Sequence, residues 1–62
     1  MTSEQVMLGA ALAMLKRYGD QAPLKVAERI GELAVDGDEM GVAIWTAIAG
    51  RMEEILRSGA MH

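Results

Sequence analysis

The sequence predicts an all-α protein, a single domain of three helices over about residues 3–18, 23–36 and 39–58. Composition is the first reason: apolar residues make up 52% of the chain, with one Trp, one Tyr and no Phe. The apolar volume therefore comes from aliphatic residues and Met, and Ala, Leu and Met are among the strongest helix formers. The second reason is that helix stop and start signals divide the chain twice, and no segment alternates apolar and polar residues as a strand does. A chain of 62 residues allows one domain, residues 1–62.

The first predicted helix begins with a capping box. Thr2 is the expected N-cap, and Gln5, at the third helical position, can accept a hydrogen bond from the backbone N–H of Thr2. Lys16 and Arg17 occupy the last turn, where cations are favourable, and Gly19 follows as a stop signal.

The second and third helices are separated by a short turn. Pro23 opens the second helix, because its missing N–H would have no partner in the first turn. Gly37 is the expected left-handed terminator, and Asp38 is the expected N-cap of the third helix, which ends before Gly59. The third helix has a broad apolar side with Trp45 near its centre, where the indole either fills the core alone or also reaches an interface.

The first helix is apolar on every side, since residues 6–15 contain no charged or hydrogen-bonding side chain. Such a helix is normally buried all round, and this chain is too short to surround it. We therefore expect a second copy or another protein to cover it, most simply as a homodimer, because symmetric dimers are the commonest closed assemblies. The alternative is that loops and tails of the same chain cover it. The residues expected at the interface are Met7, Leu8, Ala11, Leu12, Leu15 and Trp45.

Small residues are expected where helices approach closely. Gly9, Ala10 and Ala13 would let a second helix approach the first one. Glycine inside a helix costs about 1 kcal/mol relative to alanine. Close approach to a neighbouring helix is the expected compensation at Gly31, Gly41 and Gly50.

The charged side chains indicate a solvated surface and no catalytic site. Glu28 and Glu32 share one side of the second helix with cations, as on an exposed face. Arg51 is expected to pair with one of these carboxylates, with ligand binding as the alternative role. No serine or threonine has a base arranged near it. We predict no catalytic residue and a protein that is not an enzyme.

No metal or cofactor site is predicted either. The chain has no Cys, and its one His, His62, is the last residue of the sequence, which argues against thiolate and imidazole ligands. Asp36-Gly37-Asp38-Glu39 is similar to the start of a calcium loop, but the twelfth position of such a loop would be Ala47 instead of glutamate. The stretch is interpreted as a helix end followed by an N-cap.

Charge and hydropathy argue against two classes of partner, nucleic acids and membranes. Nine acidic and six basic residues give a formal net charge of −3, which argues against nucleic-acid binding because phosphates require a basic face. The ten residues 6–15 are too few to cross a bilayer, which takes about 20. Glu4 precedes them where a signal peptide would be basic. We expect a cytoplasmic protein that binds neither nucleic acid nor membranes.

The middle of the chain carries a set of residues that can be compared with a known group. This set is Ala27-Glu28-Arg29-Ile30, Gly37-Asp38, Gly41-Val42, Trp45, Ile48-Ala49 and Arg51. In these residues the stretch 22–51 resembles short alphaproteobacterial helical proteins of unknown function, which are single small domains. The group has no established activity, so the resemblance implies a small, free-standing bacterial protein and no catalytic residue.

Two functional hypotheses follow. The first is a non-enzymatic module for self-association or protein–protein interaction that uses the apolar first helix. The second is a small helical protein that binds a hydrophobic ligand in a Met-lined space between its helices. The mass of the protein in solution and the presence of copurified small molecules distinguish the two hypotheses.

Overall fold

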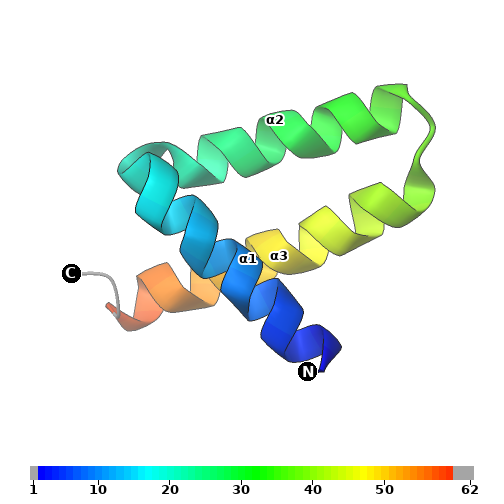
Figure 1. The fold of residues 1–62 in the computed structure, drawn as a ribbon. Coiled ribbons are helices and arrows are strands. Elements are labelled where there is room, and N and C mark those ends of the chain that lie inside the picture. Colours follow the sequence, from blue (N-terminus) through cyan, green and yellow to red (C-terminus); the bar gives the residue numbers. More distant parts are fainter. Residues whose placement is uncertain (1, 60–62) are drawn as a thin grey trace.

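The computed structural model describes residues 2–59, and most of this part of the chain is helical (Figure 1). Its elements are α1 (Ser3–Tyr18), the 3₁₀ helix η1 (Gly19–Gln21), α2 (Ala22–Val35) and α3 (Glu39–Ser58), and residues 2–59 contain no strand. The all-α prediction is confirmed. His62, the one histidine of the chain, lies outside the described residues.

The prediction of three separate helices with two short connections is wrong at the first connection. α1, η1 and α2 follow one another directly from residue 3 to residue 35 with no loop between them, so the described chain consists of two helical stretches, 3–35 and 39–58. The direction of the backbone changes at η1 (Figure 1). Gly19, with a φ of 56°, ends α1, and its N–H donates to the carbonyl of Leu15. The tighter 3₁₀ turn then carries the chain directly into α2.

The predicted caps are confirmed. The backbone N–H of Gln5 donates to Thr2 Oγ1 at 3.1 Å, and the backbone N–H of Thr2 donates to Gln5 Oε1 at 2.9 Å, which completes the capping box. Gly37 has a φ of 74° and ends α2 as expected. Asp38 Oδ1 accepts a hydrogen bond of 2.9 Å from the backbone N–H of Gly41 and so caps α3.

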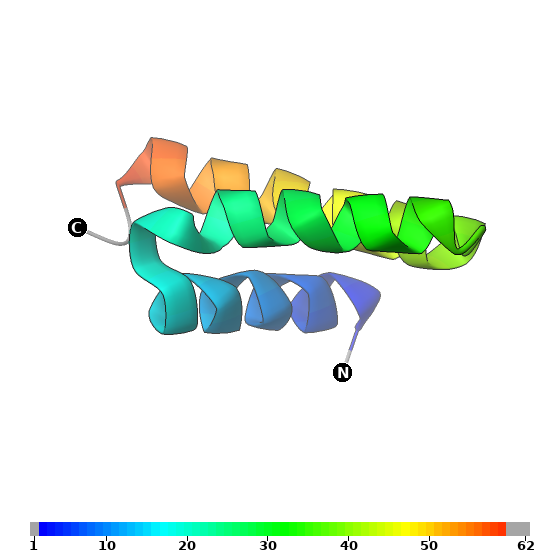
Figure 2. The same cartoon turned by 90° about the horizontal axis from the view of Figure 1, so that it is seen from above.

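The helices form two layers. α2 and α3 lie side by side as an antiparallel hairpin, and α1 crosses one face of that hairpin (Figures 1 and 2). The molecule is accordingly flat, with extents of 35 × 27 × 17 Å. The end of the hairpin that holds the α2–α3 connection extends beyond the N-terminal end of α1 in both views.

The core lies between the two layers. Small side chains at the contact, Ala11 of α1 and Ala22 of α2, are both 0% exposed, so the two layers can approach closely. Met52 of α3 is 1% exposed and is the largest fully buried side chain. The core cluster consists of Ala11, Leu15, Ala22, Val26, Ile48, Met52 and Ile55.

Candidate association surface

The residues predicted at the interface are divided between the core and the surface. Ala11 and Leu15 are 0% and 5% exposed and belong to the core of the chain itself. Met7 and Leu12 are half-buried against that core, whereas Leu8 is 40% exposed. The stripe predicted for the interface is therefore largely the stripe that packs on the hairpin. The sequence does not indicate which side of α1 packs on the hairpin, because α1 is apolar on all sides.

The opposite side of α1 remains accessible. Val6 is 55% exposed, and Gly9 and Ala13 are exposed as well. A Cβ atom added to Gly9 would meet no other atom within 4 Å, so the space beside it is open. Val6, Gly9 and Ala13 are called the outer face of α1 below. No polar side chain occurs in α1 between Gln5 and Lys16, so the outer face is apolar along its whole length.

The close helix approach that was expected at the helical glycines does not occur within the chain. Added Cβ atoms at Gly31 and Gly50 would meet nothing within 4 Å, and both residues are exposed. Gly41 has a different role, because its Cβ would come within 2.6 Å of Asp38 Oδ2. The missing side chain at Gly41 leaves room for the carboxylate that caps α3.

Trp45 is half-buried and packs against the core. Its exposed part borders a cavity of about 310 Å³ between α1 and the charged side of α2. The ring of Tyr18 lines the same cavity, with Arg17 Cζ 5.4 Å and Lys25 Nζ 5.8 Å from its centroid, within the range of cation–π attraction. The cavity is lined by Met14, Tyr18, Lys25, Glu28, Arg29, Glu32 and Trp45.

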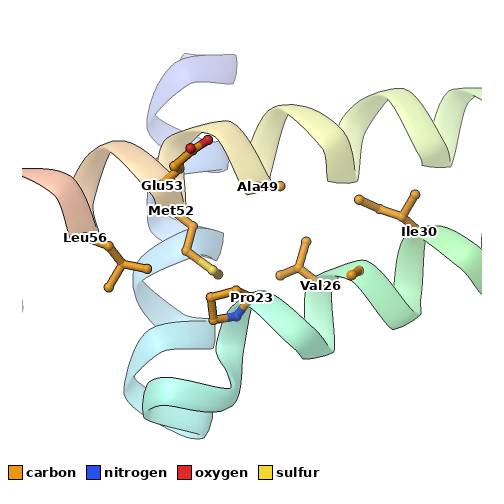
Figure 3. Close-up of a pocket in the computed structure, with 8 residues that line it drawn as sticks. Pro23, Val26, Ile30, Ala49, Met52, Glu53 and Leu56 are labelled. Atoms are coloured by element: carbon orange, nitrogen blue, oxygen red, sulfur yellow. The ribbon is translucent and has the colours of Figure 1, made fainter.

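A second cavity lies between α2 and α3. In the close-up, α1 is behind the two helices and the lining side chains are in front, so the cavity is on the face of the hairpin away from α1 (Figure 3). Its volume is about 360 Å³, and among its lining residues Glu53 is the one charged residue. The ligand hypothesis expects a Met-lined space between helices, but Met52 is the one methionine in this lining. The lining residues are Pro23, Val26, Ala27, Ile30, Ala49, Met52, Glu53 and Leu56.

Arg51 forms an ion pair with α1, whereas the sequence predicted an ion pair with α2. Arg51 Nε lies 2.9 Å from Glu4 Oε1, and Arg51 Nη1 lies 3.2 Å from Glu54 Oε1. The reason is that α1 crosses α3 (Figure 1), so the Glu4 carboxylate comes within reach of the guanidinium. The carboxylates of α2 pair with cations of their own helix. These pairs are Lys25–Glu28 at 3.6 Å and Arg29–Glu32 at 3.3 Å.

Charge is distributed unevenly along the hairpin. Residues 30–50 contain four acidic residues and no Lys or Arg, whereas the rest of the chain has six basic and five acidic residues. The α2–α3 connection is therefore an acidic end of the molecule. Lys16, Arg17 and Lys25 flank the connection at η1, at the opposite end (Figure 1). The four acidic residues are Glu32, Asp36, Asp38 and Glu39.

No three His, Asp or Glu side chains within residues 2–59 are grouped so that they could hold a metal ion. The stretch 36–39 forms a helix end and an N-cap, as interpreted from the sequence. Of the helices at residues 2–59, none has the length and apolar character needed to cross a membrane.

A family model described as "Family of unknown function (DUF6961)" matches residues 3–59. The chain belongs to this family. No curated protein and no solved structure matches it. The DUF6961 match extends from the first residue of α1 to the glycine that ends α3, and thus beyond the stretch 22–51 that carried the resemblance to proteins of unknown function. The DUF6961 region therefore includes α1 and its outer face, together with the hairpin on which α1 packs.

Proposed function

We propose that this DUF6961 protein is a non-enzymatic helical interaction module of the bacterial cytoplasm that associates with a second copy of itself through α1. One observation carries the proposal: α1 packs on the hairpin with one side and presents an apolar outer face to solvent with the other. A surface helix of a monomer normally places polar or charged side chains on that second side.

The energies involved support association. The chain buries eight apolar side chains within residues 2–59, which is a small core. Val6 and Leu8 of α1 are 55% and 40% exposed; full burial of one such side chain from water contributes about 1.5–3 kcal/mol, and burial of the exposed parts of these two together contributes about that amount. A domain of this length has a total stability of about 5 kcal/mol or less. Covering α1 would thus add a large fraction of the stability of the fold in each copy, and association and folding would be coupled.

The first experiment measures absolute mass by light scattering over a dilution series, with helicity followed by circular dichroism. We expect a dimer at high concentration and a loss of helicity as the dimer dissociates. A fully helical monomer at every concentration would contradict self-association. In that case the outer face would be available for another protein, and affinity capture would be the next step.

A variant of the outer face tests which side of α1 is used. Ala13 is exposed, and glutamate is a good helix former, so Ala13→Glu should leave the packing of α1 on its own hairpin intact while it places a charge in the interface. We expect the dissociation constant to rise at least tenfold. Ala43→Glu, the same change at an exposed position of α3, is the matched control and should have little effect. Equal weakening by both variants would contradict the use of the outer face.

A second candidate function is favoured by the cavity between α2 and α3. Its volume of about 360 Å³ lies at the lower end of the range for small-molecule sites, and its lining is apolar apart from Glu53. A small hydrophobic ligand could bind there without involving α1. Native mass spectrometry of the purified protein tests this function, because a bound ligand would add a discrete mass that Ala27→Trp should remove by filling the cavity.

A further inference from the structure

The end of the hairpin that extends beyond α1 has an uncovered side. We call this end the overhang and its side toward α1 the underside. Met14 and Tyr18 of α1 line a cavity together with Trp45 and Glu32, so these two hairpin residues mark the underside. In Figure 2 the layer that contains α1 does not continue beneath the overhang.

The underside has an apolar strip on α3. Ile44 is four and seven residues before Ile48 and Arg51, and Arg51 reaches α1 through Glu4, so helical periodicity places Ile44 on the same side of α3. Met40, one further turn toward the connection, shares that side. Ile44 is 45% exposed and Met40 is 73% exposed.

The underside is acidic on α2. Glu32 lines the cavity that faces α1, and Asp36 follows it by four residues, on the same side of the helix. Within residues 2–59, Asp36 forms no ion pair, and neither do Lys16 and Arg17 at the other end of the molecule. The underside and α1 are therefore complementary, because each combines an apolar strip with a charged end of opposite sign.

We infer that the second copy binds beneath the overhang, so that each α1 lies between its own hairpin and the hairpin of the partner. This inference rests on the proposed self-association and specifies its geometry. The outer face of the partner's helix covers Met40 and Ile44, and the cationic end of that helix approaches Glu32 and Asp36. The arrangement accounts for a helix that is apolar on opposite sides, because both sides are then covered by protein.

The order of charges along α1 agrees with this geometry. Within each copy, the cationic C-terminal end of α1 lies beside α2, and its N-terminal half crosses α3 (Figure 1). If the two-fold axis of the dimer runs roughly parallel to α1, the α1 of the second copy has the same direction as the α1 of the first copy. Its C-terminal end then also lies on the α2 side of the first hairpin, and its N-terminal half on the α3 side. This arrangement therefore brings Lys16 and Arg17 of the second copy to acidic α2, and its apolar residues to α3. An isologous contact of this kind closes after two copies, because both use the same surface.

A charge exchange tests the inference. Arg17→Glu and Asp36→Arg should each raise the dissociation constant of the dimer at least tenfold, because each places like charges together. The combined variant should restore the constant to within about threefold of the original value. Arg57→Glu and Asp20→Arg make the same changes of charge at exposed positions away from the overhang, and they should have little effect. Circular dichroism at high protein concentration verifies that each variant remains helical.

The outcomes separate this inference from the proposed function. If the unmodified protein is a monomer at all concentrations, self-association itself is wrong. If it is a dimer but the combined variant is as weak as the single ones, the dimer stands and the overhang geometry is wrong.

A cross-linking experiment provides an independent test, because the chain has no Cys of its own. Ala13→Cys chains mixed with Ile44→Cys chains should form more mixed disulfide dimers than either variant forms alone. Predominant cross-linking of Ala13→Cys with itself would overturn the inference, since it would place one α1 outer face directly against the other.

Discussion

Glu4 and Arg51 form the one ion pair that joins different helices within residues 2–59. Glu4 Oε1 lies 2.9 Å from Arg51 Nε, across 47 positions of sequence. The other ion pairs of this region lie within α2 or within α3. The pair connects the first turn of α1 to the fourth turn of α3, so its strength reports on the packing of α1 against the hairpin.

Glu4→Gln should lower the free energy of unfolding by about 0.5 kcal/mol, the usual size for an exposed pair. The side chains of Glu4 and Arg51 are 58% and 34% exposed, so water screens much of their attraction. Urea titrations at low and at about 1 M salt measure the effect, which should shrink in salt. Glu53→Gln, which removes a 3.9 Å pair within α3, is the control. A loss of more than about 2 kcal/mol for Glu4→Gln would show that solvent does not screen the pair.

Met52→Ala should lower the free energy of unfolding by about 2–5 kcal/mol, because it removes a buried side chain and leaves a cavity. Met52 is 1% exposed and lies in the core cluster shared by all three α-helices. The loss approaches the whole stability of a small domain, so circular dichroism should show a largely unfolded chain. Leu24→Ala, at a site 54% exposed, is the control at the same protein concentration. Comparable helicity of the two variants would contradict this core.

Gly41→Ala and Gly31→Ala should change the stability in opposite directions. A Cβ at position 41 would lie 2.6 Å from Asp38 Oδ2 and would disturb the N-cap of α3, and a lost cap costs about 0.5–2 kcal/mol. A Cβ at position 31 would meet nothing within 4 Å, so the gain in helix propensity, up to about 1 kcal/mol, should remain. Thermal unfolding followed by circular dichroism measures both shifts. Stabilisation by both substitutions would mean that the Asp38 carboxylate is free to move.

Local features of the fold were predictable from the sequence. The capping box of Thr2 and Gln5, the left-handed Gly37 and the N-cap Asp38 each depend on residues within a few positions of one another, and all three predictions are confirmed. The bounds of α1 and α3 agree with the expected ranges, whereas α2 begins and ends one residue earlier than expected. A short connection was expected between residues 18 and 23, but its 3₁₀ conformation at Gly19–Gln21 was not, because a 3₁₀ turn has no distinct sequence signal.

Contacts between helices were less predictable, since they depend on how the helices cross. Arg51 was expected to meet Glu28 or Glu32, and it meets Glu4 because α1 crosses α3. Ala11 and Leu15 were expected at an interface between molecules, and they lie in the core of one molecule. With an apolar residue on every side of α1, hydrophobic periodicity cannot tell which stripe faces the hairpin. A space between helices was expected, but its position between α2 and α3 and its lining were not, because the lining comes from two helices.

The shortness of the two connections has a consequence for the speed of folding. η1 has three residues, and three more separate α2 from α3, so most contacts form between residues that are close along the chain. Chains with such local topology fold in microseconds to milliseconds. Encounter between two chains at micromolar concentration is slower, at typical association rate constants of about 10⁵–10⁷ M⁻¹s⁻¹. Refolding of the proposed dimer should therefore show a fast phase independent of concentration, followed by a slower phase whose rate rises with the amount of protein.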